Sequence, residues 1–206
     1  SQQQQQAEKL QTFKQTQRQQ KASFEKNKKQ RQLTVAKLHK QLLTSQEKLA
    51  KLESEEENLV AALARIATLS KQDVDLTGLS QLKRKLSWPL KGKIRRNFGS
   101  QKQGFLKWKG VLMAASIGKQ VQTIHNGTVL FSDWLKGYGL VTVIDHGEGY
   151  MSLYGHNQAL LKSVGDRVET GEPIALVGQS GGQSQSALYF EIRHNGQAVN
   201  PKLWCR

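Results

Sequence analysis

Apolar residues between Val35 and Ile66 recur at the spacing of a coiled-coil heptad. The residues between them are mostly Lys, Gln and Glu, which favour helix, and no Pro or Gly interrupts the run. The pattern therefore predicts a long helix with one apolar stripe. The core positions of the heptads are Val35, Leu38, Leu42, Ser45, Leu49, Leu52, Glu56, Leu59, Leu63 and Ile66.

The apolar stripe is weaker upstream of Val35, where lysines alternate with Leu10 and Phe24 at the core positions. We expect residues 1–69 to form one coiled-coil arm, cut at its N-terminal side because the Gln-rich start is typical of the inside of a longer chain. A single helix cannot bury its own stripe. The sequence leaves three partners open: residues 10–29 folded back, a second copy, or a preceding segment.

Residues 70–87 interrupt the heptads with Asp73, Asp75, Thr77 and Gly78. Four leucines then recur at roughly helical spacing, which predicts a linker with a short amphipathic helix after a capping turn. Either this helix regulates a neighbouring site, or its leucines simply pack on the following domain. The leucines are Leu76, Leu79, Leu82 and Leu86.

From Trp88 onward, Gly becomes frequent and short apolar runs alternate with turn residues, which predicts an all-β domain over residues 88–206. The expected fold class is thus α + all-β: a coiled-coil helix followed by a β-sandwich or split barrel. The expected strands are 121–124, 127–135, 140–146, 151–155, 167–168, 174–178, 187–194 and 197–199.

The net charge of +15 suits an anionic partner such as nucleic acid, a phospholipid surface or a cell-wall polymer. No helix-turn-helix, zinc-finger or RNP-like motif favours nucleic acid, so we expect none to be bound. The single cysteine, Cys205, excludes an internal disulfide and a Cys-based zinc site. No apolar run reaches the length of a membrane span.

The run from Ser186 to Arg193 alternates like a half-buried strand, with Ala187, Tyr189 and Glu191 on one face. This run and five others, in order, resemble the motifs of the lysostaphin/LytM-type zinc peptidases. The run 108–115 resembles the His-x-Gly-x-Asp-x-Ala-Ala signature, and the run from Ser186 to Arg193 resembles the strand with His-x-His. The remaining matching runs are 136–147, 152–156, 164–174 and 199–201.

The resemblance maps the three zinc ligands of this family onto Trp108, Leu112 and Tyr189, and the other catalytic histidine onto Ala187. Trp and Leu offer no lone pair to a metal, and Tyr is a poor ligand at neutral pH. Of the family's functional histidines only His156 is present, and one imidazole does not hold a metal. We therefore expect no metal, no cofactor and no catalytic residue. His125, His146 and His194 are expected to be structural or exposed.

Apolar and aromatic residues at the former metal site predict a groove that binds a protein partner, since Trp, Tyr and Arg dominate binding hot spots. The alternative is that the lost site has become part of the core. The expected groove residues are Trp108, Lys109, Leu112, Tyr138, Tyr154, His156, Ala187, Tyr189 and Arg193.

A coiled coil before a LytM domain with a degenerate metal site is similar to the murein hydrolase activators of this family. That resemblance implies a periplasmic, septal protein that activates zinc-dependent N-acetylmuramoyl-L-alanine amidases in daughter-cell separation, with peptidoglycan as a further partner. Its coil would dock on an FtsEX-type membrane complex, and a helical arm, here the Leu76–Leu86 segment, would cover the groove. The alternatives are an active zinc peptidoglycan endopeptidase and a periplasmic efflux adaptor.

Overall fold

The computed structural model describes residues 2–69 and 76–206, and it has two compact units that meet within the first helix. Helix α1 spans Gln2–Leu69, as the heptad pattern predicts. In the first unit, Ser1–Ala50, Val35, Leu38 and Leu42 expose 65%, 58% and 54% of their surface, so this part of the stripe is open to a partner. Within the described residues, no helix is long and apolar enough to cross a bilayer.

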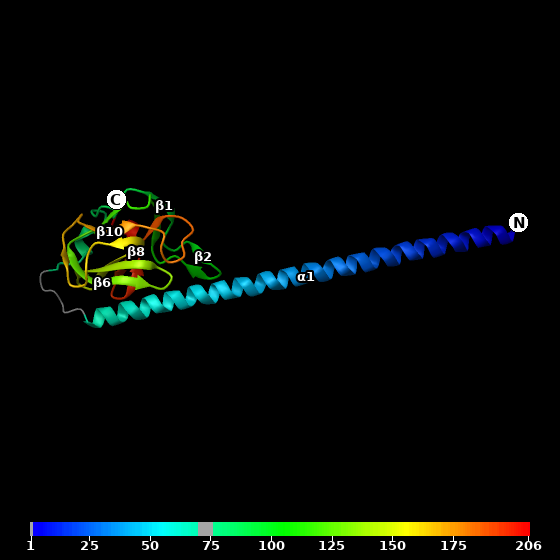
Figure 1. Ribbon diagram of the computed structural model, residues 1–206, viewed down its shortest axis with the longest axis horizontal. Helices are drawn as coiled ribbons and strands as arrows, with labels where there is room; N and C mark the ends of the chain where they lie inside the picture. Colours follow the sequence, from blue (N-terminus) through cyan, green and yellow to red (C-terminus); the bar gives the residue numbers. More distant parts are fainter. Residues whose placement is uncertain (1, 70–75) are drawn as a thin grey trace. The chain divides into compact units, whose positions relative to one another are not determined.

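The second unit, Lys51–Arg206, contains an antiparallel β domain, which confirms the expected fold class of a helix followed by an all-β domain (Figure 1). Its main sheet runs in the order β1-β4-β11-β8-β7-β6-β9. β10 pairs with β8, β5 pairs with β10 and β12 pairs with β11, while β2 and β3 form a separate hairpin. The strands are β1 (Lys93–Arg96), β2 (Gln101–Gln103), β3 (Leu106–Lys107), β4 (Val111–Ala114), β5 (Gln120–Gln122), β6 (Gly127–Leu135), β7 (Gly139–Gly147), β8 (Tyr150–Leu160), β9 (Arg167–Val168), β10 (Pro173–Val177), β11 (Ala187–His194) and β12 (Gln197–Val199).

All eight expected strands are present, and β6, β9, β11 and β12 have the expected bounds. The first four strands were not expected. β1 is rich in Lys and Arg, and β2 and β3 are short and polar, so none of them shows the apolar alternation of a half-buried strand.

The main sheet is buried on both faces, and each face has its own apolar cluster. On β11, Leu188, Phe190 and Ile192 belong to the first cluster, whereas Ala187 and Tyr189 belong to the second. The two faces predicted for this strand are therefore confirmed, but the strand is buried on both faces and is not half-buried as expected. Both clusters need a cover, because one sheet cannot shield its own two faces from water.

The segment after residue 75 covers the first face. Leu79 and Leu86 are buried in the first cluster, and Leu82 packs against it. The indole Nε1 of Trp204 donates a hydrogen bond to the carbonyl oxygen of Leu79 at 3.0 Å, which fixes the chain there. These leucines therefore support the packing alternative of the sequence analysis.

The amphipathic helix predicted for this segment is not formed within the described residues 76–87. The only helical element there is the 3-10 turn Ser80–Leu82. Gly78 and Arg84 flank this turn with positive φ angles of 66° and 58°, which no continuous right-handed helix allows. The part of the predicted linker from residue 70 to 75 lies outside the described residues.

The end of α1 covers the second face. Leu59 and Leu63, at heptad core positions, are 1% and 4% exposed and belong to the second cluster, and Ile66 packs against it. Two such leucine side chains contribute roughly 4 kcal/mol of burial. The second half of the apolar stripe therefore has a partner in its own chain, which the sequence pattern did not identify.

Candidate partner-binding groove

The three positions that correspond to zinc ligands lie together on the second face of the sheet. Leu112 on β4 is directly opposite Tyr189 on β11, and the centroid of the Trp108 ring lies 6.2 Å from that of Tyr189. Ala187 is opposite Ala114 on the same strand pair. The motif positions thus converge as the sequence resemblance predicts.

Two further aromatic rings complete this surface. The Tyr138 centroid lies 5.1 Å from that of Tyr189, and the His156 ring stacks on Tyr138 at 6.4 Å. Such tilted and offset pairs add to the free energy that burial provides. We call Trp108, Leu112, Tyr138, His156 and Tyr189 the aromatic groove, after the partner-binding surface that the sequence predicts. All but Trp108 are buried in this structure.

The aromatic groove does not fit a zinc ion. The only side-chain oxygen at the three ligand positions is the Tyr189 hydroxyl, and it donates a 2.5 Å hydrogen bond to Oε2 of Glu191. Burial, followed by the negative charge of Glu191, holds the pKa of Tyr189 well above its usual value, so the hydroxyl keeps its proton. Among residues 2–69 and 76–206, no three His, Cys, Asp or Glu side chains are grouped to hold a metal.

A buried ion pair lies beside Tyr189 on the same strand. Arg193 donates to Oε1 of Glu191 at 2.5 Å and to the carbonyl oxygen of Gly196 at 2.6 Å. Burial raises the pKa of Glu191, while the Arg193 guanidinium opposes that rise. The carboxylate therefore fixes both the tyrosine and the arginine, two residue types that often anchor protein partners.

His156 has a structural role in this structure. Its Nδ1 lies 3.0 Å from the carbonyl oxygen of Ser180, and its Nε2 lies 3.1 Å from the side-chain nitrogen of Gln183. A neutral imidazole with its proton on Nδ1 satisfies both contacts, since it donates to Ser180 and accepts from Gln183. The residue has a φ angle of 65°, so these bonds also stabilise an uncommon backbone conformation.

Two buried histidines predict that the domain loses stability in acid. Burial is the main cause that lowers the pKa of both His146 and His156 from 6.5 to about 4. Between these values the unfolded chain binds protons that the folded chain excludes, so the unfolding free energy falls by about 3 kcal/mol per histidine from neutral pH to about pH 4. Urea unfolding across this pH range measures the change.

A His156→Gln variant isolates one of the two contributions. Its unfolding free energy should depend less steeply on pH than that of the unchanged chain, by about half of the histidine contribution. Equal slopes for both proteins would contradict a neutral, buried His156.

The end of α1 lies over the aromatic groove. Leu59 and Leu63 share one cluster with Leu112, Tyr138 and Tyr189. We call residues 52–66 of α1 the covering segment.

A glycine allows the close approach of the covering segment. A Cβ atom on Gly137 would lie 2.5 Å from the carboxylate of Glu55, closer than atoms of this kind approach. The Gly137 residue, which has a φ angle of 83°, therefore allows the buried Glu55 to approach the backbone beside Tyr138.

Opposite charges surround the contact between the groove and the covering segment. Nζ of Lys109 lies 3.6 Å from Oε1 of Glu56, and Nζ of Lys102 lies over the rings of Trp108 and Tyr138 at 5.1 Å and 5.8 Å. Burial lowers the pKa of Lys102, and the carboxylates of Glu56 and Glu55 oppose that change. The groove thus combines an aromatic floor with cations that attract an acidic segment.

Not every residue expected in the groove lies there. Tyr154 is fully buried in the first cluster, where its hydroxyl oxygen accepts hydrogen bonds from Ser152 and from the backbone N–H of Ile124. Its place follows from the alternation of β8, because it lies opposite Phe190, which also faces the first cluster. The Leu76–Leu86 segment, expected to cover the groove, supplies buried leucines to the first cluster instead.

Several residues at the groove were not expected from the sequence. The heptad already marked Leu59 and Leu63 as apolar, but it gave no sign that they pack on the domain that follows. The sequence has four glutamates in residues 53–57 and a strongly basic domain after them, and this opposite charge could have predicted that the two segments pack together. The residues missed are Glu55, Glu56, Leu59, Leu63 and Lys102.

Comparison with known proteins shows which family of protein domains residues 106–201 resemble. Residues 106–201 match the model of peptidase family M23. The catalytic domain of lysostaphin from Staphylococcus simulans superimposes with a TM-score of 0.50 at 24% sequence identity, covering 53% of this chain and 89% of that domain, and shows the shared fold alone. Residues 106–201 therefore resemble a peptidase family M23 domain, as the motifs predict, with apolar and aromatic residues at the positions to which the resemblance maps the metal ligands.

Within this class, the chain is similar to two named activators. It is 54% identical over 127 residues to the murein hydrolase activator EnvC of Escherichia coli, covering 62% of this chain and 30% of that protein. It is 38% identical over 115 residues to the murein hydrolase activator NlpD of Salmonella dublin, covering 55% and 29%. The chain spans less than a third of the length of either relative, and both are named as activators of hydrolases.

Proposed function

We propose that this chain activates a peptidoglycan hydrolase and does not itself cleave peptidoglycan. The observation that carries the proposal is the aromatic groove, in which Trp108, Leu112 and Tyr189 stand at the positions of zinc ligands. A zinc peptidase needs three protein ligands and an open position for water, and these side chains provide neither. The names of the two relatives support the same role.

The activated enzyme, in this proposal, is a zinc-dependent N-acetylmuramoyl-L-alanine amidase that binds the aromatic groove. Tyr138, Tyr189 and Arg193 are the anchors, because buried aromatic and arginine side chains dominate most interfaces. The protein would act in the periplasm at the division septum, where the amidase splits the peptidoglycan layer. Its coiled-coil arm would dock on an FtsEX-type membrane complex.

The covering segment makes this activity conditional. While Leu59 and Leu63 occupy the second cluster, Leu112, Tyr138 and Tyr189 are buried and only Trp108 of the groove is half-buried, so the groove offers little apolar surface to an enzyme. Activation then requires a shift from the covered state of the groove to an open state. The enzyme favours the open state because it binds that state more tightly than the covered one. The Lys109–Glu56 pair and the buried leucines set the free energy of that shift.

A dye-release assay on labelled peptidoglycan tests the proposed function. The chain alone should release no dye, and the chain mixed with a zinc-dependent amidase should release more than the amidase alone. The reason is that Trp108, Leu112 and Tyr189 replace the side chains that would hold a nucleophile-activating zinc, while the groove would stabilise the active enzyme. Release by the chain alone, or a mixture that never exceeds the amidase, would contradict the proposal.

A further inference from the structure

The charge of the β domain is strongly uneven along the chain. Residues 76–132 contain eleven Lys and Arg side chains and no Asp or Glu. Three of these cations, Lys102, Lys107 and Lys109, lie on the hairpin and beside the groove, where Glu55 and Glu56 provide counter-charge for Lys102 and Lys109. The other eight belong to the segment before β4 and to the turn after it.

Five of these cations lie on edge strand β1 and beside it, and we call them the basic edge. Within the part of the chain that the structure describes, β1 pairs with β4 alone, so its other edge carries no strand there. All five residues are exposed, and the Lys119 ammonium donates to the carbonyl oxygen of Lys91, which joins the turn after β4 to the start of β1. The basic edge consists of Lys91, Lys93, Arg95, Arg96 and Lys119.

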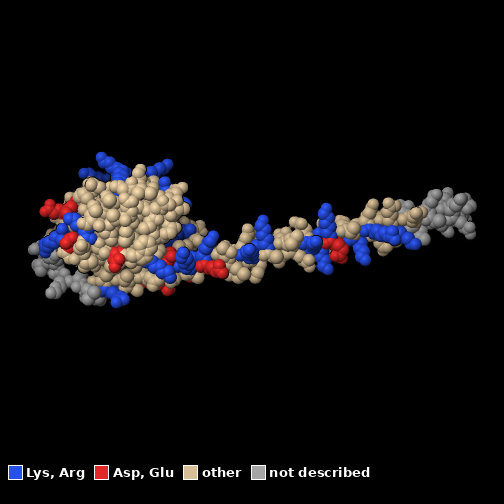
Figure 2. Space-filling model, viewed as in Figure 1, with Lys and Arg blue, Asp and Glu red and all other residues tan. Residues whose placement is uncertain are grey.

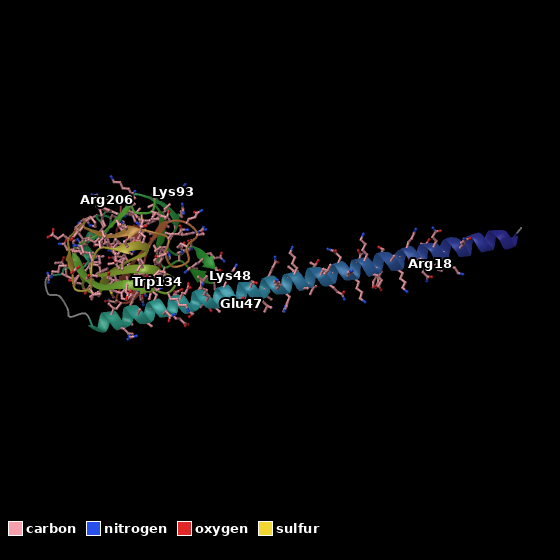
Figure 3. The ribbon with its side chains drawn as sticks, viewed as in Figure 1. Arg18, Glu47, Lys48, Lys93, Trp134 and Arg206 are labelled. Atoms are coloured by element: carbon pink, nitrogen blue, oxygen red, sulfur yellow. The ribbon has the colours of Figure 1, made fainter. Side chains whose placement is uncertain are left out.

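Figure 2 shows Lys and Arg side chains gathered at the margin of the domain where β1 and the C-terminus lie in Figure 1. Lys93 and Arg206 project from this same side in Figure 3. Among residues 2–69 and 76–206, no carboxylate lies within ion-pair distance of the basic edge, and the one side-chain partner there is the neutral Gln185, which accepts from Arg95 at 2.6 Å. Clustered cations without counter-charge repel each other, so they favour binding of an external polyanion.

We infer that the basic edge is a second binding site, separate from the aromatic groove, and that its ligand is the carboxylate-bearing peptide network of peptidoglycan. This inference rests on the proposed function, which places the chain at the cell wall. Arg and Lys side chains form charge-assisted hydrogen bonds with carboxylates, and guanidinium groups bind them through two parallel bonds. The edge would hold the activator on the polymer while the groove engages the enzyme.

A membrane surface is the other anionic ligand to consider. Peripheral membrane proteins combine basic residues with apolar side chains that enter the lipid. The exposed aromatic residues of this domain are Phe105, in the β2–β3 turn, and Trp134, on β6. Trp134 and Lys93 lie toward different margins of the domain (Figure 3), and Phe105 belongs to the β2–β3 turn and not to β1. Ile117, in the same turn as Lys119, is the exposed large apolar side chain nearest in sequence to the basic edge. Five cations with one aliphatic neighbour fit a hydrated polymer better than a lipid surface.

Co-sedimentation with purified peptidoglycan sacculi, with no hydrolase present, tests this inference. Replacing three edge cations by Gln should weaken binding by about tenfold, because each removes an ion pair with the polymer. A matched triple in α1 removes the same charge elsewhere and should bind like the unchanged chain. The edge variant is Lys91→Gln/Lys93→Gln/Arg96→Gln, and the control variant is Lys21→Gln/Lys28→Gln/Lys37→Gln.

Two further binding experiments identify the ligand of the basic edge. Sacculi whose carboxylates have been converted to neutral amides should bind the unchanged chain about as weakly as native sacculi bind the edge variant. Vesicles of phosphatidylglycerol should bind less than sacculi, and raised salt should release the chain from sacculi. The edge variant should still stimulate an amidase on soluble peptidoglycan fragments, so loss of sacculus binding and loss of the proposed function are separate results.

Four outcomes would overturn the inference. Equal binding by the unchanged chain and the edge variant would show that the edge does not contact the polymer, and self-association of that variant would mean that the charges only protect a free strand edge. Equal weakening by both triples would indicate unspecific attraction by net charge. Stronger binding to vesicles than to sacculi would assign the edge to lipid.

Discussion

Releasing the covering segment should increase amidase stimulation by about tenfold or more. In a Leu59→Glu/Leu63→Glu variant, two side chains that are 1% and 4% exposed become charged and no longer fit the second cluster. Losing roughly 2 kcal/mol of burial per leucine shifts the equilibrium toward the open groove by more than tenfold. Dye release in a mixture with the amidase measures the effect, and the variant alone should release nothing.

The matched control lies on the same helix turn. Val60 is 45% exposed and lies outside the second cluster, so Val60→Glu adds a charge without opening the groove. We expect this variant to stimulate the amidase like the unchanged chain. If the double variant also behaves like the unchanged chain while its β domain stays folded, the segment does not control access.

Changing Tyr189 should strongly weaken stimulation of the amidase by the chain whose covering segment has been released. Tyr189→Leu, added to Leu59→Glu/Leu63→Glu, removes the ring that contacts Trp108 and Tyr138 and the hydroxyl that donates to Glu191. Loss of a hot-spot residue costs about 2 kcal/mol or more, which corresponds to about thirtyfold weaker stimulation. A titration of the amidase with each variant gives this ratio.

Tyr154→Leu in the same background is the control for general loss of stability. Tyr154 is also fully buried, but it faces the first cluster, on the other side of the sheet. Both substitutions should lower the thermal transition, and only that of Tyr189 should reduce stimulation. Equal stimulation by the two variants would assign enzyme binding to another surface.

The sequence predicts the β domain well where side chains alternate and poorly where they do not. β11 shows its two faces directly, because Leu188 and Phe190 alternate with Ala187 and Tyr189. β1 carries mostly Lys and Arg, because an edge strand tolerates charge, and its sequence therefore lacks the pattern of a half-buried strand. Apolar residues thus reveal β11, which is buried on both faces, whereas the exposed and charged β1 gives no such signal.

The sequence predicts the residues of the aromatic groove, but it does not predict the covering segment that packs on them. Family motifs place Trp108, Leu112 and Tyr189 together, and register across β4 and β11 then determines their contacts. A heptad indicates that Leu59 needs an apolar partner, but it is equally compatible with another helix or with a sheet. The leucines of the 76–86 segment have the same ambiguity, and they pack on the first face.

One stripe of α1 cannot have two neighbours at once. Its residues near Val35 and Leu42 are open, and the same seam continues to Leu59 and Leu63, which lie in the second cluster. A second helix that pairs with this stripe, starting from its exposed residues, would have to displace the sheet from Leu59 and Leu63 once the pairing extends past Leu52. The number of paired heptads would then determine whether the groove is covered or open. Lengthening the helix pairing would in this way control the stimulation of the enzyme.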